Sequence, residues 1–452
     1  MSESLAVAIT RAGDPVTLLR NASAPATVFP VAPEFTNWRS EQHAWASTCA
    51  LLDQSHHMTD LFVRGRDAPQ LFSDLGVNSF AGFGIDRAKQ FVAVGPDGRL
   101  IGDAILFHLA DTEFDLVGHP MAVDWVAFHA ARGGYAVDLE RDDNSAVRAS
   151  GPPVFYRYEV QGPTAPALLE QVTGGPLPQT RFFGMARFTI AGGAVRGLRH
   201  GMAGRPGFEL FGPWTDGEAV LAALLEAGAA HGLVRAGAKA YSTANLESGW
   251  APAPLPAVFG DDPLLAEYRS WLPASGVGAL GGSHDSLDVD AHTVTPYDLG
   301  YGRHVAFDHD FVGRTALEKI AADPPRDKVT LVWNDDDVTA ALGSILDDGP
   351  RAKYLDLPKV RYALHHQDRV LRDGRQIGVS LDCGYVANEH ALLSLATVDT
   401  AHAEPGAEVT VVWGEDPVTA KPQVEEHTQR EIRATVAPAP YVQFARTRYR
   451  SS

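Results

Sequence analysis

Alternation of hydrophobic and polar positions predicts several strands in the first half of the chain. Residues 61–65 read L-F-V-R-G, and residues 90–94 and 100–107 stand on either side of the turn sequence G-P-D-G. Two alternating segments joined by such a turn predict a β-hairpin. Residues 113–117 and 156–161 have the same pattern and predict two more strands.

Helical spacing of the apolar positions predicts helices over residues 38–52, 164–172 and 216–231. The last of these has leucine and valine side chains on one face, as expected of a helix that packs on a sheet. A glycine-rich turn within residues 188–211 predicts the two strands that this helix covers.

The final third of the chain has short strands separated by glycine, aspartate and proline turns. The predicted strands are residues 329–333, 376–380 and 408–413. This pattern is typical of a small β-barrel or sandwich, which we expect over residues 326–452. The polar segment 142–153 is the expected boundary between two interwoven lobes of residues 1–325.

Length and charge narrow the class of protein. A chain of 452 residues is long enough for two or three domains. Its formal net charge of −18 argues against a nucleic-acid or anionic-membrane partner, since both need a concentrated cationic face. Cys49 and Cys383 match no disulfide or zinc spacing, and no run of ~20 apolar residues indicates a membrane span. We therefore expect a cytoplasmic protein without a structural metal.

Residues 235–252 combine side chains that suit a functional site. A phenol (Tyr241), a carboxylate (Glu247) and an indole (Trp250) lie close together among short polar residues, and a proline-rich segment follows. The pattern predicts a strand end or short helix that leads into a loop, and loops on rigid scaffolds often carry function. The alternative is that both aromatic residues belong to the core and that Glu247 is a solvated charge.

Three other groups of polar residues are candidates for function. His56 and His57 are adjacent, but no third ligand stands at metal-binding spacing. Asp103 interrupts an apolar strand, either as an outward-facing residue or as a buried functional acid. The histidines and aspartates of residues 284–292 predict a solvated acidic loop. Dinucleotide, Walker and G-x-S-x-G motifs are missing from the sequence.

Six motifs in register resemble the folate-dependent aminomethyltransferase family, which contains the T-protein of glycine cleavage. They are S-H-H-M with V-R-G (55–65), D-G with G-D-A-I-L (97–106), E-F-D-L-V (113–117), L-R-H-G with G-R-P-G-F-E-L (198–210), N-L-E-S-G (245–249) and F-V-G-R-T-A-L (311–317). Together they span most of the chain.

Longer segments are similar to one branch of this family, the tetrahydrofolate-dependent O-demethylases of vanillate, syringate or 3-O-methylgallate. These segments are residues 35–42, 51–61, 88–93, 240–250 and 295–302. The resemblance implies an α+β fold: a three-domain ring with mixed and antiparallel sheets and a C-terminal β-barrel. It also implies tetrahydrofolate in the central hole and methyl transfer from a methoxylated aromatic to N5, giving 5-methyltetrahydrofolate and a phenol.

The resemblance assigns roles that the chemistry supports. Tyr241 falls on the essential tyrosine of this branch, and an acid near the ether oxygen would help a phenolate to leave. His57 is the second catalytic candidate and can contact the ring hydroxyl of the substrate. Glu247 is expected to hold the pterin, with Trp250 against the pterin or the substrate ring. The other residues expected to bind the cofactor are Arg199 and Glu209.

The sequence also departs from the family. Only Asp103 remains of a pair of aspartates, and the loop of residues 200–206 has a different sequence, which argues against glycine cleavage. His119 stands where the demethylases place an arginine for the substrate carboxylate, so we expect His119 to contact the substrate and to favour substrates without a carboxylate. The alternatives are a demethylase of a sulfonium or amine substrate and a folate-binding protein without catalytic activity. The sequence predicts no oligomeric state.

Overall fold

In the computed structural model, which describes residues 3–23, 29–419 and 421–450, a five-stranded antiparallel sheet contains the predicted hairpin. Its strands, in spatial order, are β3 (Arg87–Val94), β4 (Leu100–Ala110), β5 (Glu113–Gly118), β2 (Thr59–Arg64) and β6 (Asp138–Asp142). The strands predicted at residues 61–65, 90–94, 100–107 and 113–117 are therefore confirmed.

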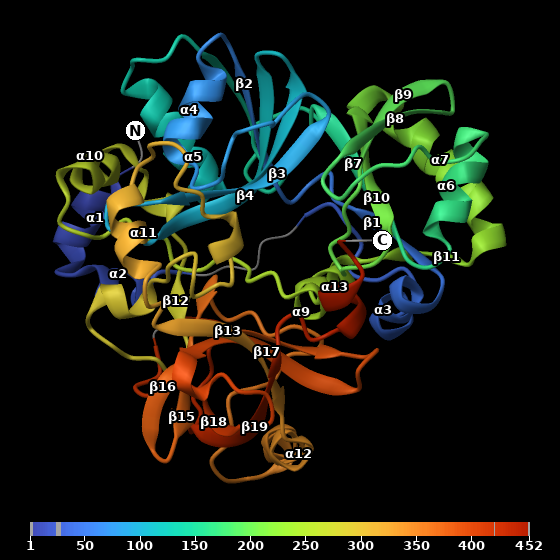
Figure 1. Cartoon of the computed structure of the whole chain (residues 1–452). Coiled ribbons are helices and arrows are strands. Elements are labelled where there is room, and N and C mark those ends of the chain that lie inside the picture. Colours follow the sequence, from blue (N-terminus) through green and yellow to red (C-terminus); the bar gives the residue numbers. More distant parts are fainter. Residues whose placement is uncertain (1–2, 24–28, 420, 451–452) are drawn as a thin grey trace.

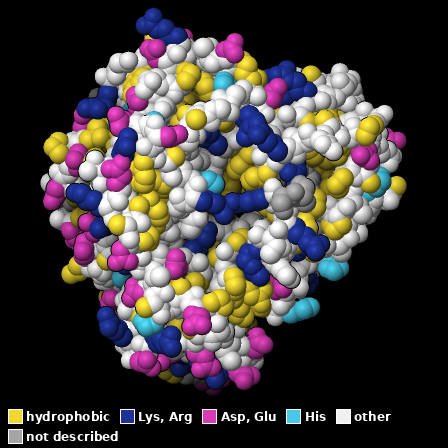
Figure 2. All heavy atoms as spheres, in the orientation of Figure 1, with side chains coloured by type: hydrophobic (Ala, Val, Ile, Leu, Met, Phe, Trp, Pro, Cys, Tyr) yellow, Lys and Arg dark blue, Asp and Glu magenta, His cyan; other side chains and the backbone are white. Residues whose placement is uncertain are grey.

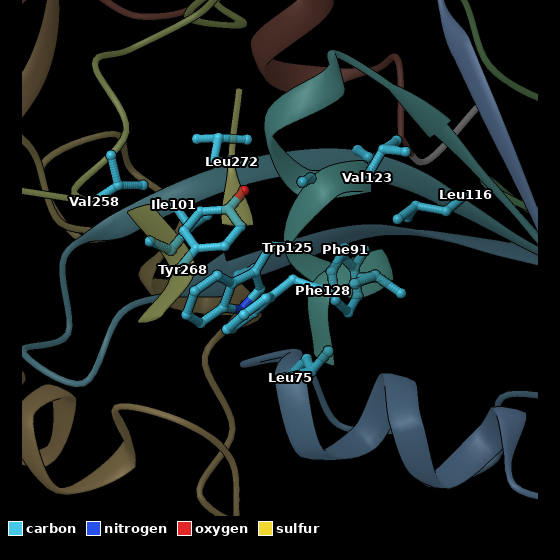
Figure 3. Packing of buried hydrophobic residues seen from close by; sticks show 14 of the residues in the cluster. Leu75, Phe91, Ile101, Leu116, Val123, Trp125, Phe128, Val258, Tyr268 and Leu272 are labelled. Carbon is cyan, nitrogen blue, oxygen red and sulfur yellow. The ribbon is translucent and has the colours of Figure 1, made fainter. Parts of the chain in front are cut away.

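Helices cover one face of this first sheet (Figure 1). They are α4 (Ala68–Leu75), α5 (Pro120–Ala131) and α10 (Pro263–Trp271), with α1 (Leu5–Ala12) and α2 (Pro15–Asn21) beside α10. Figure 3 shows Trp125 and Phe128 of α5 against Tyr268 of α10, with ring centroids 4.9 and 5.0 Å from the tyrosine ring. These aromatic side chains bury the apolar face of α5 and fix the end of β5 from which that helix starts.

The second sheet is mixed and has six strands. In spatial order these are β11 (Leu233–Ala236), β1 (Cys49–Asp53), β7 (Phe155–Gln161), β10 (Gly207–Pro213), β9 (Gly193–Leu198) and β8 (Met185–Ile190), with only β1 and β11 parallel. The packed helices are α3 (Trp38–Ser47), α6 (Ala165–Thr173) and α7 (Gly217–Gly228). The glycine-rich segment thus forms three strands where the sequence predicted two.

The helix predicted over residues 38–52 is too long. Helix α3 ends at Ser47, and Cys49–Asp53 forms β1 in the interior of the second sheet. Strand β1 is covered on both faces, so its apolar residues do not alternate, and a short apolar run of this kind cannot be distinguished from the end of a helix by periodicity.

A closed six-stranded barrel confirms the β-barrel predicted for the C-terminal part. Its strands, in spatial order, are β13 (Arg326–Trp333), β17 (Ala391–Asp399), β16 (Arg375–Val386), β15 (Asp368–Arg372), β18 (Glu408–Trp413) and β19 (Arg430–Pro438). Helix α12 (Asp335–Gly343) packs on β19. Trp333 and Trp413 fill the barrel core with ring centroids 5.8 Å apart.

Short segments connect the three bodies. They are α8 (Ala238–Tyr241), α9 (Ala244–Ser248), α11 (Arg314–Ile320), α13 (Gln443–Thr447) and the short parallel pair β12 (Leu280–Gly281) and β14 (His365–His366). Figure 1 shows the two sheets above, the barrel below, and α9 and α13 where the three meet. The predicted α+β class is confirmed, whereas the exact limits of the domains stay a prediction. Within the described ranges, no helix is long and apolar enough to cross a membrane.

Candidate active site

Two glycines fix the geometry of residues 235–252, the candidate segment of the sequence. Gly237 precedes α8 at a point where a Cβ atom would lie 2.4 Å from the carbonyl oxygen of Pro33, so a larger residue does not fit. Gly249 ends α9 with a φ of +73°, which favours glycine. Tyr241 is thereby held at the end of α8, and Trp250 follows α9 in a loop. The prediction of a short helix that leads into a loop is confirmed.

Tyr241 and His57 form a pair at the meeting point of the bodies. The tyrosine hydroxyl lies 2.8 Å from His57 Nε2, and Gln54 Nε2 lies 3.5 Å from the same hydroxyl. Burial lowers the pKa of His57 to about 4, and burial together with the charges of Glu159 and Glu209 raises the pKa of Tyr241 well above its ordinary value. Both side chains are therefore neutral at pH 7, and Tyr241 keeps a proton that it can donate.

Glu159 adds a second proton to this centre. Its carboxyl oxygens accept hydrogen bonds from Gln54 Nε2 (2.6 Å) and from the backbone N–H of Met202 (2.7 Å). The side chain is fully buried and has no cationic partner among the described residues, so burial raises the pKa of Glu159 to about 8. A chain of polar groups thus leads from a protonated carboxyl through Gln54 to the Tyr241 hydroxyl.

Glu209 lies beside this centre in a buried charge cluster. Arg157 Nη1 pairs with Glu209 at 3.2 Å, and Arg157 Nη2 pairs with Asp115 at 2.7 Å and also with Asp60. Burial raises the pKa of Glu209, while Arg157 opposes that rise. The position next to Tyr241 fits the predicted contact of Glu209 with a bound cofactor.

Glu247 is completely buried and already has several partners. Its Oε1 accepts hydrogen bonds from Trp45 Nε1 and Asn388 Nδ2, both at 2.9 Å, and its Oε2 lies 3.3 Å from Arg205. These partners join α9 to α3, to the loop before β10 and to the barrel. These three hydrogen bonds leave an acceptor position on Oε2, so the carboxylate could also accept a hydrogen bond from an N–H group of a pterin.

Asp103 lies in a polar patch with Trp250. Its Oδ2 accepts a hydrogen bond from Gln90 Nε2 at 2.6 Å, and the Trp250 side chain also hydrogen-bonds to it. Burial raises the pKa of Asp103 to about 6. Of the two alternatives for this residue, the structure favours the functional acid, because the side chain is only partly exposed and its carboxylate is hydrogen-bonded to Gln90.

A group of cations lies close to Asp103. Lys328 donates a hydrogen bond of 2.6 Å to the carbonyl oxygen of Gly249, and burial followed by the charge of Arg303 lowers the pKa of Lys328 to about 7. Burial and Arg303 also lower the pKa of Arg450 to about 10. Figure 2 shows a hollow at the centre of one face, with hydrophobic walls and Lys and Arg side chains around it. The positive charge of Lys328, Arg303 and Arg450 suits the binding of an anionic group of a ligand.

Of the remaining predicted residues, His119 lies at the start of α5 and Arg199 directly follows β9. Among the described residues, His119 Nδ1 is buried without a hydrogen-bond partner, and burial lowers the pKa of His119 to about 4. His200 Nε2 is also buried and unpaired within that set, with its ring 6.3 Å from the Trp250 ring. Arg199 precedes His200, whose Nδ1 lies 3.1 Å from the Tyr449 hydroxyl. The unpaired nitrogens can bind polar atoms of a ligand.

The histidine-rich segments have structural partners. No group of three potential metal ligands occurs in the described part of the chain. His56 contacts Ser145 Oγ at 2.8 Å. His284 and His292 are buried, with His292 Nδ1 at 2.8 Å from Gln367 Oε1, so the prediction of a solvated loop over residues 284–292 is wrong for these two histidines. Both histidines pack against the barrel segment that contains Gln367.

Gln54, Gln90 and Glu159 were not predicted from the sequence as members of the site. Strand β7 alternates tyrosine and valine with Arg157, Glu159 and Gln161, and all of these residues are buried. The available signal was a predicted strand in which charged and polar residues alternate with tyrosine and valine. The burial of both faces could be seen only in the sheet.

The fold resembles that of a solved enzyme. The crystal structure of glycine cleavage system aminomethyltransferase T from Bartonella henselae aligns with a TM-score of 0.61, covers 90% of each chain and is 19% identical in sequence. A family model described as the GCVT N-terminal domain matches residues 22–253. These two comparisons define the class of protein to which the ring of two sheets and a barrel belongs.

Relatives of known name refine this assignment. Syringate O-demethylase from Sphingobium sp. is 46% identical over 458 aligned residues, which cover 100% of this chain and 99% of that relative. Sesamin methylene transferase from Sinomonas sp. is 30% identical over 84% of this chain and 82% of its own length. The chain belongs to the aminomethyltransferase family, as its motifs predicted.

Proposed function

We propose that this protein transfers the methyl group of a methoxylated aromatic compound to N5 of tetrahydrofolate, giving 5-methyltetrahydrofolate and a phenol or catechol. The observation that carries the proposal is the proton-bearing Tyr241 hydroxyl, 2.8 Å from neutral His57 and linked through Gln54 to Glu159. Identity of 46% over the whole chain with a syringate O-demethylase supports the reaction class. It also favours an aromatic substrate over a sulfonium or amine.

The described residues fit tetrahydrofolate. The cofactor has an amine-rich ring that needs acceptors and a glutamate tail that needs cations. Glu209 and Asp103 offer carboxyl oxygens near Trp250 and Tyr241, and Lys328 with Arg303 offers positive charge close by. Bound tetrahydrofolate would supply N5 as the acceptor of the methyl group.

The catalytic groups of the protein manage the proton on the leaving oxygen. When the bond between the methyl carbon and the ether oxygen breaks, the oxygen would leave as a phenolate. Tyr241 donates its proton to this oxygen, so that a neutral phenol leaves, and His57 holds the hydroxyl in line. The proton released from the acceptor nitrogen restores Tyr241, so the overall reaction neither gains nor loses a proton.

Other predicted residues bind and orient the ligands. We propose that Trp250 stacks on the pterin or the substrate ring and that Arg199, with Glu209, contacts the cofactor. Glu247 accepts hydrogen bonds from Asn388 and Arg205, and we propose that its remaining acceptor position binds an N–H group of the pterin. His119 contacts the substrate through its unpaired nitrogen as a neutral group.

The test is a direct assay of methyl transfer. The purified protein is incubated with tetrahydrofolate and, in turn, with syringate, vanillate and guaiacol, and the folate products are separated by chromatography. We expect 5-methyltetrahydrofolate together with one equivalent of demethylated phenol from at least one substrate. Consumption of no methoxylated substrate, with intact folate binding, would instead support the non-catalytic alternative.

A further inference from the structure

The C-terminal segment of residues 439–450 passes from the barrel to a loop of the second sheet. It leaves β19, forms α13 against α9 and meets residues 200–206, the loop that precedes β10 (Figure 1). The contact is close, since a Cβ atom on Gly204 would lie 2.7 Å from the Cβ atom of Ala445, and one on Gly249 would lie 3.0 Å from the Cα atom of Pro440. The segment therefore packs against both the 200–206 loop and the end of α9.

Tyr449, near the end of this segment, binds the loop through its hydroxyl. The Tyr449 side chain is buried, and its ring lies edge-on to the Phe182 ring with centroids 5.1 Å apart. The hydroxyl donates a hydrogen bond of 2.8 Å to the carbonyl oxygen of Gly201, accepts one from the N–H of the same residue, and lies 3.1 Å from His200 Nδ1. One phenol oxygen thus binds both polar backbone groups of Gly201.

The next two residues of the loop bind side chains of β7. The N–H of Met202 donates to Glu159 Oε1 at 2.7 Å, and the N–H of Ala203 donates to Gln161 Oε1 at 3.1 Å. Three successive N–H groups of one loop are therefore each bound by a side chain. Strand β7 supplies two of these side chains, and Tyr449 supplies the one that holds the first N–H group.

This loop contacts the catalytic centre in two ways. The backbone of Met202 binds Glu159, whose other carboxyl oxygen accepts the hydrogen bond from Gln54. The Met202 side chain packs against the same apolar cluster as Tyr241. The hydrogen bond from Met202 also opposes the effect of burial on Glu159, because an N–H donor favours the ionised carboxylate and lowers its pKa. A shift of the loop would change both the position of the Glu159 carboxyl and its hold on the proton.

We infer that Tyr449 is a positioning residue for the reaction: its hydroxyl fixes the 200–206 loop so that the Met202 N–H keeps the Glu159 carboxyl on Gln54. The inference rests on the proposed function, and it gives the segment after the barrel a part in the active site. A role in packing would need only the ring of Tyr449, because the contact with Phe182 does not use the hydroxyl. Removal of the hydroxyl alone therefore separates the two roles.

The experiment removes one oxygen atom. Tyr449→Phe keeps the ring against Phe182 and loses the contacts of the hydroxyl. The matched control Thr447→Val removes a hydroxyl of the same segment whose hydrogen bond of 2.9 Å stays within α13. We expect Tyr449→Phe to lower kcat for syringate with tetrahydrofolate by about tenfold or more, with a change in KM of about twofold or less. Thr447→Val should match the wild type, and thermal denaturation checks that both variants are folded.

The pH profile gives a readout that a change in packing would not move. In the wild type, kcat/KM should fall as the pH rises through the pKa of Glu159, about 8. Without the hydrogen bond from Met202, Glu159 holds its proton more tightly, so the alkaline limb of Tyr449→Phe should move to higher pH. The other groups that act on Glu159, which are Glu209 and Gln54, are the same in both proteins.

An infrared titration separates this inference from the proposed function. Infrared spectra of each protein minus those of its Glu159→Gln counterpart follow the protonated carboxyl band of Glu159 with pH and need no turnover. If the wild type transfers no methyl group, the proposed function fails, and the titration still tests the link between Tyr449 and Glu159. The same titration of Glu159 in wild type and Tyr449→Phe would overturn the inference, and so would a wild-type kcat in the folded variant. A loss of thermal stability alone would make Tyr449 a packing residue.

Discussion

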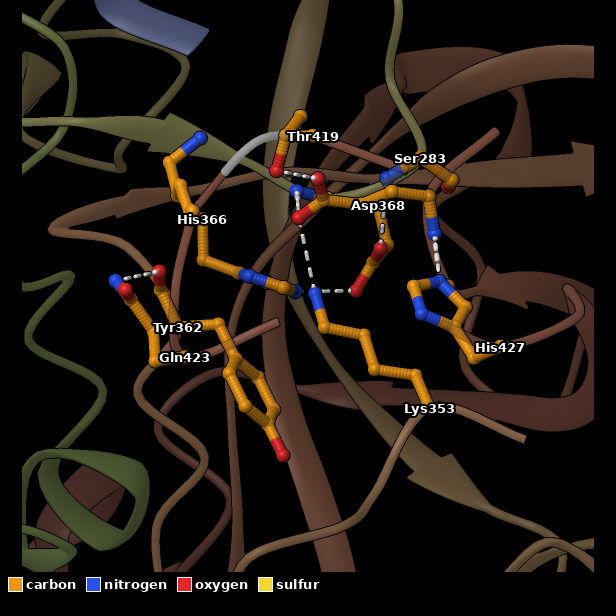
Figure 4. Close-up of polar contacts among 12 residues, drawn as sticks. Ser283, Lys353, Tyr362, His366, Asp368, Thr419, Gln423 and His427 are labelled. Atoms are coloured by element: carbon orange, nitrogen blue, oxygen red, sulfur yellow. Dashed lines mark hydrogen bonds and ion pairs between the residues drawn. The ribbon is translucent and has the colours of Figure 1, made fainter. Parts of the chain in front are cut away.

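Two buried glutamates, one in the barrel and one at the centre, show how partners decide what a carboxylate does. In the barrel, Glu415 pairs with Lys353 at 3.0 Å and accepts hydrogen bonds from the N–H of Gly282 and from Thr419 Oγ1 (Figure 4). Burial alone would raise its pKa, but these partners hold the pKa of Glu415 at about 2. At the centre, Glu159 has an amide and a backbone N–H, and burial raises its pKa to about 8.

The difference separates a structural from a functional cluster. Lys353 and Glu415 satisfy each other, and the lysine also lies 4.6 Å from the Tyr362 ring. The centre instead keeps two neutral acids, Tyr241 and Glu159, neither of which has an ion-pair partner among the described residues. Buried acids that keep their protons near neutral pH are typical of sites that transfer protons, so this difference indicates a functional centre.

The largest expected effect is the loss of turnover in Tyr241→Phe. Removal of a positioned general acid typically slows the reaction by about 10²–10⁴-fold, while folate and substrate should still bind. The matched control is Tyr362→Phe in the barrel, which loses a hydrogen bond of 2.9 Å to the Tyr354 carbonyl oxygen and should keep full activity. Steady-state kinetics measure both. Near-normal turnover of a folded Tyr241→Phe protein would remove this tyrosine from the mechanism.

The barrel cluster is tested by stability rather than by activity. Lys353→Met leaves Glu415 buried without its cation, which typically costs about 3–5 kcal/mol. Urea denaturation measures this loss in the free energy of unfolding, and kcat of the remaining folded protein should not change. A loss below about 1 kcal/mol would show that this pair is not the main partner of Glu415.

Substitution of Glu159 sharpens the contrast through pH. The folded protein holds the Glu159 proton more tightly than the unfolded chain, whose glutamate pKa is about 4.3. The stability that this proton gives is complete below pH ~4.3 and is lost as the pH rises towards 8. The glutamine of Glu159→Gln cannot ionise, so this variant does not lose stability as the pH rises. Its free energy of unfolding relative to that of the wild type should therefore increase between pH ~4.3 and 8.

Glu415→Gln provides the opposite control for that measurement. Ionised Glu415 stabilises the folded state above pH ~4.3, and this contribution is lost as the pH falls towards 2. The deficit of Glu415→Gln relative to wild type should therefore shrink only in acid. Urea denaturation at a series of pH values measures the free energy of unfolding of each variant relative to wild type. The same pH dependence for both variants would contradict the assigned protonation states.

The smallest expected effect concerns His119. His119→Arg adds a permanent cation beside the proposed substrate position, and kcat/KM for vanillate relative to guaiacol should rise by up to about tenfold. Thermal denaturation checks that the variant is folded. An unchanged ratio would mean that His119 does not face the substrate.

How much the sequence could predict depended on whether the signal was local. The hairpin of β3 and β4 and the barrel strands were predicted because alternation and turn residues are local features. Strand β1 was not, since its first four residues are all buried and therefore do not alternate between apolar and polar. The six motifs indicated the family, and the resemblance of residues 240–250 to its demethylase branch indicated Tyr241.

Partners distant in the sequence explain what was missed at the site. Glu247 was predicted as a ligand from its motif, whereas its contacts with Trp45 and Asn388, which are 202 and 141 positions away, could not be predicted. The link between Tyr241 and His57 spans 184 positions, and the motif of each residue was the only guide to it.

The most direct test of the proposed reaction follows the methyl group itself. Syringate that carries deuterium in its methoxy groups is incubated with tetrahydrofolate and the wild-type protein, and the folate is analysed by mass spectrometry. We expect the three deuterium atoms of one methyl group to appear intact in 5-methyltetrahydrofolate, with one molecule of phenol formed for each, and Tyr241→Phe to abolish both. Labelled methanol or formaldehyde, with unlabelled folate, would contradict direct transfer of the methyl group.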